Sequence, residues 1–379
     1  MKNNKGFSLV EIIISISILA IMFSFIFYFV STINLRAVNI DNKPYIQTGY
    51  NYSNKYCYLE DEQLERLSMI KDLDMSTYIS TGTPITSINI FHKDRLILTT
   101  NSASTSEADI FIFDFNSLNL MASLDVGPGI NDSLLIDNTF YVLNTSVNSH
   151  VKTFKINPDN NSMFIISDIK ISELSESYSL PKKIYLYNKK ILIGSEKNNS
   201  GGELFVLPLN EDNIPNSPAI SIEIGGQVNS MYEDNNSLYI ANASDTELFI
   251  YDKDFNLDKY YDAPLSLGNG KSVYFLNPHI YLGRTVSSFE LFFIEIENDI
   301  LNLIDKYKTS GSIDFIQKMD QYIVIFANSE NKELQFFSYD MNLKKTLDLP
   351  SRVNTYDCFQ NTLLTAHIIN NQSHILWLK

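Results

Sequence analysis

From about residue 76 to the C-terminus, apolar and polar positions alternate over short distances in a pattern typical of β-strands. Runs of β-branched and aromatic residues are separated by Asn, Asp, Ser and Gly, the residues that favour tight turns. A strand that ends in small polar residues recurs at intervals of about 40–50 residues, over 96–101, 140–145, 191–195, 238–243, 280–284, 323–328 and 363–367. The body of the chain is therefore a repeat protein built from strands.

Each recurrence lies inside a unit of four strands. A strand such as 87–91 and a tight turn precede it, while an amphipathic strand such as 109–113 and a closing strand such as 118–124 follow it. Four strands in about forty residues is the signature of a β-propeller blade. A β-sandwich has no such period, and a solenoid repeats faster. The pattern predicts an all-β, seven-bladed β-propeller.

The last unit, 354–379, has room for only three strands, of which 374–378 is the third. A spare extended segment, 75–81, precedes the first full unit. Because the two chain ends of a propeller commonly share one blade and so leave no open seam, we predict that 75–81 is the outer strand of the seventh blade. Six and eight blades are the alternatives, since the third unit carries an insertion around 210–218.

The N-terminal segment follows a different pattern. Residues 12–30 are apolar apart from three serines and one tyrosine, and as a helix this run spans about 28 Å, close to the hydrocarbon thickness of a bilayer. Lys2 and Lys5 precede the run, and the acidic bulk of the chain follows it. By the positive-inside rule the N-terminus faces the cytoplasm and the body faces out. The segment predicts a single-pass membrane helix.

Three other interpretations account for only part of this segment. A cleaved secretory signal needs a small-x-small cleavage site after the run, and 29–34 offers none. A plain signal anchor accounts for the hydrophobicity but not for Glu11, whose carboxylate would cost about 2.5–3.5 kcal/mol at full membrane depth. In the third interpretation, the Glu11 side chain extends to the lipid headgroups at the membrane surface. A buried charge needs a partner, and no Lys or Arg follows until Arg36.

The apolar run is preceded by Lys5-Gly6-Phe7-Ser8-Leu9-Val10-Glu11. This segment resembles the N-terminal methylation motif of type IV prepilins and type II secretion pseudopilins. The resemblance implies that a prepilin peptidase cuts after Gly6 and methylates the new terminal amine on Phe7. It also implies that Glu11 pairs with this amine of a neighbouring subunit in the helical bundle of a filament, where low dielectric strengthens the ion pair. The implied partners are the peptidase, other pilin or pseudopilin subunits and, before assembly, the inner membrane.

The resemblance covers only residues 1 to about 40. The family's first helix commonly continues further and packs against a small α/β head, whereas Pro44 ends the helix here and the head is far larger. We expect a leader (1–6), a hydrophobic pilin helix (7–40), a connector (41–74) and a propeller (75–379). Within the connector, 60–71 is expected to form a short amphipathic helix with Leu64, Leu67 and Ile70 on one side. The large head favours a low-copy, tip-type subunit over a repetitive shaft subunit.

Charge and cysteine content limit the partners. The formal charge of −15, without a basic block, argues against nucleic acid as a partner and against peripheral binding to anionic lipid. Cys57 and Cys358 are the two cysteines, and neither has neighbouring metal ligands. Outside the cytoplasm they can form one long-range disulfide that ties the connector to the propeller, and two unrelated thiols are the alternative. Cys358 is expected in the inner strand of the last blade.

No catalytic set, phosphate-binding loop or metal-ligand cluster is recognisable, and the five histidines show no HxH or HExxH spacing. We therefore expect neither enzymatic activity nor a cofactor. The segment 252–258 has oxygen ligands at alternate positions, as a calcium loop would. Asp114 and Asp340, however, stand at the same place in their blades, which favours a shared turn.

Taken together, these patterns predict a minor pilin or pseudopilin of a type IV pilus or type II secretion-like filament. The chain would sit first in the inner membrane with its body outside the cytoplasm, and afterwards in a pilus or pseudopilus at the cell surface or in the periplasm. Its propeller would serve tip capping, adhesion or binding of an unknown protein or carbohydrate ligand. The alternative is a membrane-anchored extracytoplasmic propeller that acts as a scaffold or ligand-binding module outside any filament. A tethered propeller enzyme is a third class.

Overall fold

The computed structural model describes residues 61–379 except 93, 105, 146–149, 172–179, 198–200, 217–219, 235, 245, 264–267, 286–287, 310, 330–331 and 360. The chain divides into a unit over Met1–Ile46 and a unit over Gln47–Lys379, and every described residue belongs to the second. The predicted leader, the helix over 7–40 and most of the connector lie outside the described residues. Within the described residues, no helix is long and apolar enough to cross a membrane.

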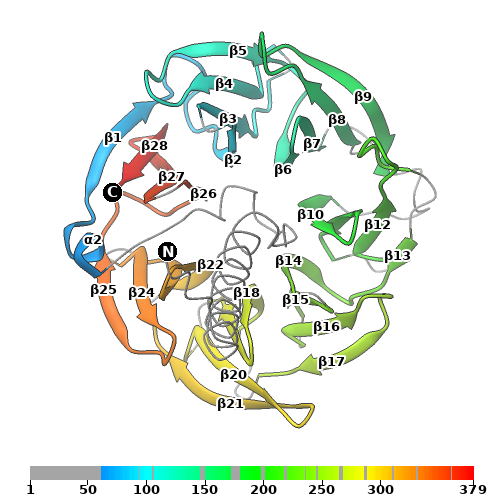
Figure 1. The fold of residues 1–379 in the computed structure, drawn as a ribbon, viewed down its shortest axis with the longest axis vertical. Coiled ribbons are helices and arrows are strands. Elements are labelled where there is room, and N and C mark those ends of the chain that lie inside the picture. Colours follow the sequence, from blue (N-terminus) through cyan, green and yellow to red (C-terminus); the bar gives the residue numbers. More distant parts are fainter. Residues whose placement is uncertain are drawn as a thin grey trace, which may run out of the picture. The chain divides into compact units, whose positions relative to one another are not determined.

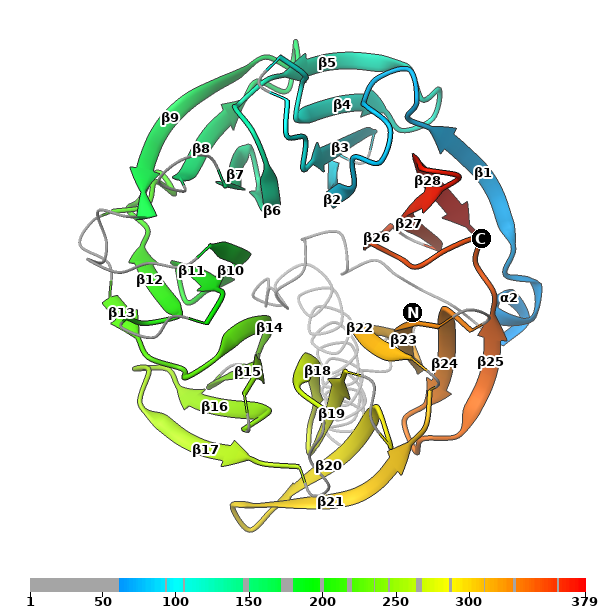
Figure 2. The ribbon, with the colours of Figure 1, turned by 180° about the vertical axis from the view of Figure 1, so that it is seen from behind.

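Seven four-stranded antiparallel sheets are arranged as blades around a common axis, which confirms the predicted seven-bladed β-propeller (Figure 1 and Figure 2). In blades 1 to 6 the strands follow one another outward from the axis in chain order. The alternation of polar and apolar positions in the sequence arises because successive side chains of a strand point to opposite faces of the blade. Each blade thereby packs one face against each of its two neighbours.

The strand boundaries follow the predicted four-strand units. Blade 1 contains β2 (Ile85–Phe91), β3 (Arg95–Thr100), β4 (Ile110–Asp114) and β5 (Leu120–Leu124). Blade 2 contains β6 (Ile130–Ile136), β7 (Thr139–Asn144), β8 (His150–Ile156) and β9 (Met163–Lys170). Blade 3 contains β10 (Pro181–Tyr187), β11 (Lys190–Ser195), β12 (Leu204–Pro208) and β13 (Ile220–Ile222), and the expected insertion lies between its last two strands.

The remaining blades repeat this order. Blade 4 contains β14 (Gln227–Glu233), β15 (Ser237–Ala243), β16 (Leu248–Asp252) and β17 (Leu257–Tyr261). Blade 5 contains β18 (Gly270–Leu276), β19 (His279–Arg284), β20 (Leu291–Glu297) and β21 (Ile300–Tyr307). Blade 6 contains β22 (Ser312–Met319), β23 (Tyr322–Asn328), β24 (Leu334–Ser338) and β25 (Leu343–Leu347). Blade 7 contains β26 (Thr355–Phe359), β27 (Thr362–Ile369), β28 (Gln372–Leu378) and β1 (Met69–Asp74).

Blade 7 is closed by a strand from the N-terminal side, but the segment differs from the predicted one. The outer strand is β1, which pairs antiparallel with β28 and places Asp74 opposite His374. The prediction of a strand over 75–81 is wrong, because the chain turns there and the backbone N–H of Tyr78 donates to the carbonyl of Met75. Asp74 initiates this turn by accepting a hydrogen bond from the backbone N–H of Ser76 at 2.8 Å.

The helix predicted over 60–71 is shorter than expected. Helix α2 spans Asp61–Arg66, while Met69 and Ile70 already belong to β1, where they are 55% and 54% exposed. Leu64 and Leu67 are buried in the core shared by blades 6 and 7. The Lys345 ammonium donates to two carbonyl oxygens in the last turn of α2, where a cation stabilises the helix dipole. Packing thus uses only the first two of the three apolar residues that suggested the longer helix.

The core lies between neighbouring blades, where apolar side chains of facing sheets interdigitate. Gly194 in β11 and Gly283 in β19 stand at equivalent positions in their blades. A Cβ atom at Gly194 would lie 2.5 Å from a methyl group of Val228, and one at Gly283 would lie 2.7 Å from a methyl group of Ile313. Both contacts are to the inner strand of the next blade, so these glycines permit the close approach of adjacent sheets.

Candidate functional site

A β-bulge recurs near the start of the inner strand in blades 1 to 6. The register shifts place the extra residue at Thr86, Asn131, Lys182, Asn229, Lys271 and Asp314. A bulge bends the strand and re-aims its side chains, and bulges often occur beside functional sites. The residues that directly follow are Ser87, Asp132, Lys183, Ser230, Ser272 and Phe315. We call these twelve residues, on the strands nearest the axis in Figure 1, the axial belt.

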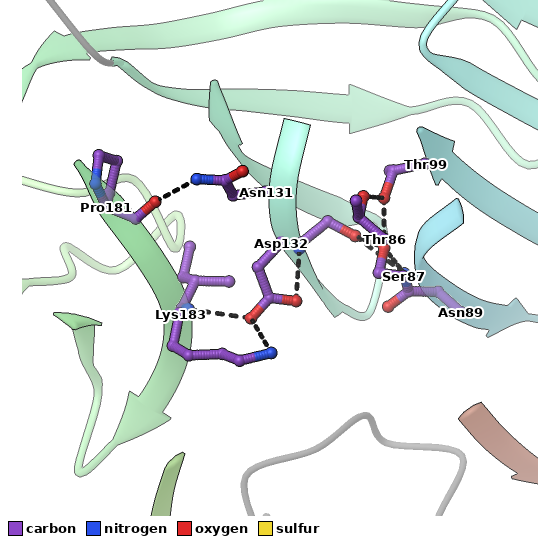
Figure 3. Close-up of polar contacts among 10 residues, drawn as sticks. Thr86, Ser87, Asn89, Thr99, Asn131, Asp132, Pro181 and Lys183 are labelled. Atoms are coloured by element: carbon purple, nitrogen blue, oxygen red, sulfur yellow. Dashed lines mark hydrogen bonds and ion pairs between the residues drawn. The ribbon is translucent and has the colours of Figure 1, made fainter. Parts of the chain in front are cut away.

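In blade 1 the belt is a cluster of hydroxyl groups that reaches into blade 2. Ser87 Oγ lies 2.6 Å from Thr99 Oγ1, and Thr86 Oγ1 lies 3.0 Å from the same atom. Ser87 Oγ also contacts Ser133 Oγ of blade 2, and Asn89 Nδ2 donates to Ser133 Oγ at 3.0 Å. Figure 3 shows this cluster beside the inner strand of blade 2. The hydrogen bonds hold the first two blades in a fixed relation.

Between blades 2 and 3 the belt makes backbone contacts. Asn131 Nδ2 donates to the carbonyl of Pro181 at 2.6 Å, and one carboxylate oxygen of Asp132 accepts from the backbone N–H of Ile184 at 3.2 Å (Figure 3). The Lys183 ammonium lies 3.9 Å from the same oxygen. Burial is the main cause that raises the pKa of Asp132, with Lys183 opposing it. The carboxyl group is therefore easier to protonate than an exposed one.

The contact made by Asn131 recurs two blades further on. Asn229 Nδ2 donates to the carbonyl of Gly270, the first residue of the next inner strand, at 2.6 Å. The two asparagines occupy the same bulge position, and both bond to the first residue of the following inner strand. The asparagine side chains at the bulge thus join neighbouring blades by hydrogen bonds.

Blades 5, 6 and 7 meet at a charged cluster around Asp314. The Lys271 ammonium lies 2.5 Å from Asp314 Oδ1, and Arg352 Nε lies 2.6 Å from Asp314 Oδ2. From blade 3, the Lys183 ammonium lies 5.8 Å from the centre of the Phe315 ring, within cation–π range. Three basic side chains therefore converge on two successive residues of β22.

A second set of contacts repeats at the links between blades. In five blades a buried carboxylate directly precedes the third strand and accepts a hydrogen bond from a backbone N–H in the link to the next blade. The acceptors are Asp109, Glu203, Glu247, Glu290 and Glu333, and the donors are Val126, Ile224, Ala263, Thr309 and Leu349. Four of these donors belong to buried residues, and Leu349 is partly buried, so the carboxylates satisfy backbone groups that have little access to water.

Side chains of the following blade also form hydrogen bonds with the same links. Asn144 Nδ2 donates to the carbonyl of Val126 at 3.3 Å, and Asn242 Nδ2 donates to the carbonyl of Ile224 at 3.4 Å. Arg284, at the corresponding place in blade 5, donates to Gly268 and pairs with Glu247 at 2.6 Å. We call such a link, bonded by both blades, a link clasp. The clasps fix the angle between blades and so position the axial belt.

Sequence reasoning missed the belt and the clasps, although each has a signal. The clasp signal is an acidic residue directly before the third strand, as in Glu203-Leu204-Phe205 and Glu247-Leu248-Phe249. An isolated carboxylate is rarely buried, so the sequence alone favours a solvated surface for these acids. The belt signal is weaker, because a bulge shifts the alternation of side chains by one residue and thereby hides which side chains face the axis.

Of the residues predicted to act in processing and assembly, Gly6, Phe7 and Glu11 lie outside the described residues, as does Cys57. Cys358 lies in β26, the inner strand of blade 7, as predicted. Its side chain is fully buried and disulfide-bonded. The pairing of Cys358 with Cys57 stays a prediction.

The segment considered as a calcium loop forms a turn. Asp252 Oδ1 accepts hydrogen bonds from the backbone N–H groups of Asp254 and Asn256, both at 2.8 Å, and Asn256 Nδ2 donates to Asp252 Oδ2 at 2.9 Å. Asp114 caps the equivalent turn of blade 1 through the backbone N–H of Ser117 at 2.6 Å. The shared turn is thus observed. Nowhere in the described part of the chain do three or more His, Cys, Asp or Glu side chains gather as a metal site.

Comparison with known proteins identifies a processing motif in the sequence before the propeller. The family described as the prokaryotic N-terminal methylation motif matches residues 1–27. A crystal structure of the computationally designed Ika8 protein is similar over 79% of this chain and 97% of that chain, with a TM-score of 0.53 and 11% sequence identity, which shows a shared fold alone. No curated protein matches the chain.

The matched motif and the propeller together define a type IV pilin-like or pseudopilin-like precursor with a propeller domain. The motif implies processing by prepilin peptidase and assembly with other pilins. It fits a chain that is first anchored in a membrane and later enters a filament.

Proposed function

We propose that the chain is a minor subunit of a type IV pilus or type II secretion-like filament and that its propeller is the filament's binding head. One observation supports this proposal: the same chain carries an N-terminal methylation motif, at residues 1–27, and a closed ring of seven blades. The motif supplies a means of assembly, and the ring supplies a rigid platform for loops and belt residues.

The size of the body supports a low-copy position at or near the tip. The described propeller extends from β1 at Met69 to β28 at Leu378, so it makes up most of the 379-residue chain. A shaft must repeat its subunits at the close spacing of packed helices, about 8–10 Å between neighbouring axes. A ring this large is accommodated most easily where no further subunit follows it.

The interior of the ring supports a binding role over a catalytic one. The asparagines of the axial belt hold neighbouring blades together, as Asn131 does with Pro181 and Asn229 with Gly270. Rigid scaffolds of this kind present ligand-binding groups without needing to move. We therefore propose adhesion, tip capping or partner binding as the activity of the head.

Incorporation into filaments tests the proposal. Replacing Glu11→Ala removes the carboxylate proposed to pair with the Phe7 amine of a neighbour, so the precursor should still be cleaved while its recovery in sheared filaments is lost. Ser17→Ala, in the same apolar run, is the matched control and should leave recovery unchanged. Gold-labelled antibody against the propeller should mark filament ends. Equal recovery of the Glu11→Ala and wild-type chains would contradict the assembly role, and recovery of the wild-type chain only in membranes would favour an anchored propeller outside any filament.

A further inference from the structure

We propose that Lys183, Lys271 and Arg352 form a carboxylate-binding site beside Phe315 and that this site takes an acidic saccharide. The inference deepens the proposed binding head by naming the place and the chemical class of its ligand. Its test does not depend on filament assembly.

The first support is that cations from two blades and one link between blades converge on the same place. Lys271 of blade 5 and Arg352 of the link into blade 7 both contact Asp314, at 2.5 Å and 2.6 Å. Lys183 of blade 3 approaches from elsewhere on the ring and lies 5.8 Å from the Phe315 ring. Because Asp314 and Phe315 are adjacent in the bulge of β22, the three cationic groups surround one small region of the axial belt.

Burial separates the two signs of charge. The side chains of Lys183, Lys271 and Arg352 are 24%, 27% and 49% exposed, whereas those of their partners Asp132 and Asp314 are 9% and 5% exposed. The carboxylates therefore lie beneath the cations and fix their position. What reaches solvent at this place is cationic.

The local charge opposes that of the whole molecule. The chain carries a formal charge of −15, yet here three cations face two carboxylates, one of which has a raised pKa because of burial. An anion approaching this region meets a local excess of positive charge, although the net charge of the chain is negative. Arg352 bonds to Asp314 through Nε, and the other N–H donors of a planar guanidinium match the two oxygens of a carboxylate.

The aromatic neighbour favours a saccharide over an acidic peptide. Phe315 is half-buried and makes an edge contact with Tyr356, whose ring centre lies 5.2 Å away, so its orientation is fixed. A pyranose ring has an apolar C–H face that packs on such a ring and an edge of hydroxyl groups that needs polar partners. A few polar groups around an aromatic surface is the usual composition of a small-molecule site. The axial belt supplies an aromatic surface and polar groups beside the cations.

Titration calorimetry of the full chain in detergent micelles tests the site. The probes are short oligogalacturonates, the same oligomers with every carboxylate methyl-esterified, and polyglutamate. The variants are the double substitution Lys183→Gln/Arg352→Gln and the control Lys253→Gln, which removes a 70% exposed lysine from a turn of blade 4. Thermal unfolding of each variant monitors the fold. If the double variant fails to fold, the single Arg352→Gln variant, whose side chain is half exposed, carries the comparison.

We expect oligogalacturonate to bind the wild-type chain and the Lys253→Gln control alike, with an affinity at least about tenfold lower in the double variant. The esterified oligomer should not bind, and added salt should weaken the binding of the free acid. Absence of oligogalacturonate binding, equal binding of the ester, or equal loss in the control would overturn the proposal. Preferential binding of polyglutamate would assign the site to an acidic peptide instead. Failure of the chain to enter filaments would leave this result unaffected.

Discussion

Glu203 offers the most direct test of the link clasps. Its carboxylate is fully buried, and Oε2 accepts hydrogen bonds from the backbone N–H groups of Ile224 and Gly225 at 2.8 Å and 3.1 Å. Replacing Glu203→Ala removes the acceptor of two adjacent backbone donors in the link between blades 3 and 4. The substitution should destabilise the propeller and loosen this link in particular.

The size of the effect follows from the burial of the two donors. A buried donor left without a partner costs about 1–3 kcal/mol. The Ile224 group is buried and would bear this cost in full, while Gly225 is exposed and can bond to water. The lost side-chain packing adds to the total, and the removal of a buried polar group offsets part of it. We expect a loss of about 2–4 kcal/mol for Glu203→Ala and about half that for Glu203→Gln, which keeps an oxygen acceptor.

Urea unfolding and hydrogen exchange measure the two consequences separately. The unfolding free energy should fall in the order wild type, Glu203→Gln, Glu203→Ala. The amides of Ile224 and Gly225 should exchange faster in the alanine variant than amides in distant blades. Glu211→Ala, which removes an exposed acid from the same blade, is the control. If the Glu203 and Glu211 variants behave alike in both measurements, the buried carboxylates do not hold the links.

Two substitutions and one digest test other parts of the account. Burial and the neighbouring Asp234 raise the pKa of Glu233 from 4.5 to about 8, so the folded chain should gain stability as the pH falls through about 8 and stop gaining near 4.5. Glu233→Gln should abolish this dependence and stabilise the chain by about 1–4 kcal/mol at pH 9, and an unchanged pH profile of urea unfolding would disprove it. Leu73→Asp places a charge in the core beside β28 and should cost about 3–5 kcal/mol, with faster proteolysis near β1; full stability would mean that β1 does not close the ring. A non-reduced digest should contain one peptide that joins Cys57 to Cys358, and two separate thiol peptides would refute this pairing.

The repeating part of the fold could be predicted because it depends on local pattern. Four strands with period-two alternation and polar turns recur in every blade, so the four-strand unit and the order of the blades follow from the sequence. Seven repeats favour seven blades, while the insertion around 210–218 leaves six and eight open. The last blade's third strand, predicted over 374–378, lies within β28 (Gln372–Leu378). Even the turn at Asp252 could be anticipated, because Asp bonds to its own following backbone.

The closing strand could not be placed from pattern because it lies at the edge of a sheet. Met69 and Ile70 of β1 are more than half exposed, so no alternation marks them as part of a strand. Their spacing from Leu64 and Leu67 instead imitates a helix face. Only pairing with β28, some 300 residues away, decides between the two.

The belt and the clasps depend on contacts between blades, which no local pattern records. Whether Glu203 is a surface acid or a buried acceptor is decided by the backbone of a link more than twenty residues further on. The cations Lys183 and Arg352 approach the same part of β22 only because the ring closes. The sequence shows a net charge of −15 and no basic block, whereas folding brings basic groups together at one place near the axis.

The central claim is that this chain is clipped after Gly6 and that the resulting N-terminus enters a filament. Mass spectrometry of the N-terminal peptide, taken from sheared filaments of cells that express the full chain, tests this claim most directly. We expect a peptide that begins at Phe7 and carries a methyl group on its amine. A chain that retains Met1, or one that is found only in membranes, would contradict the claim.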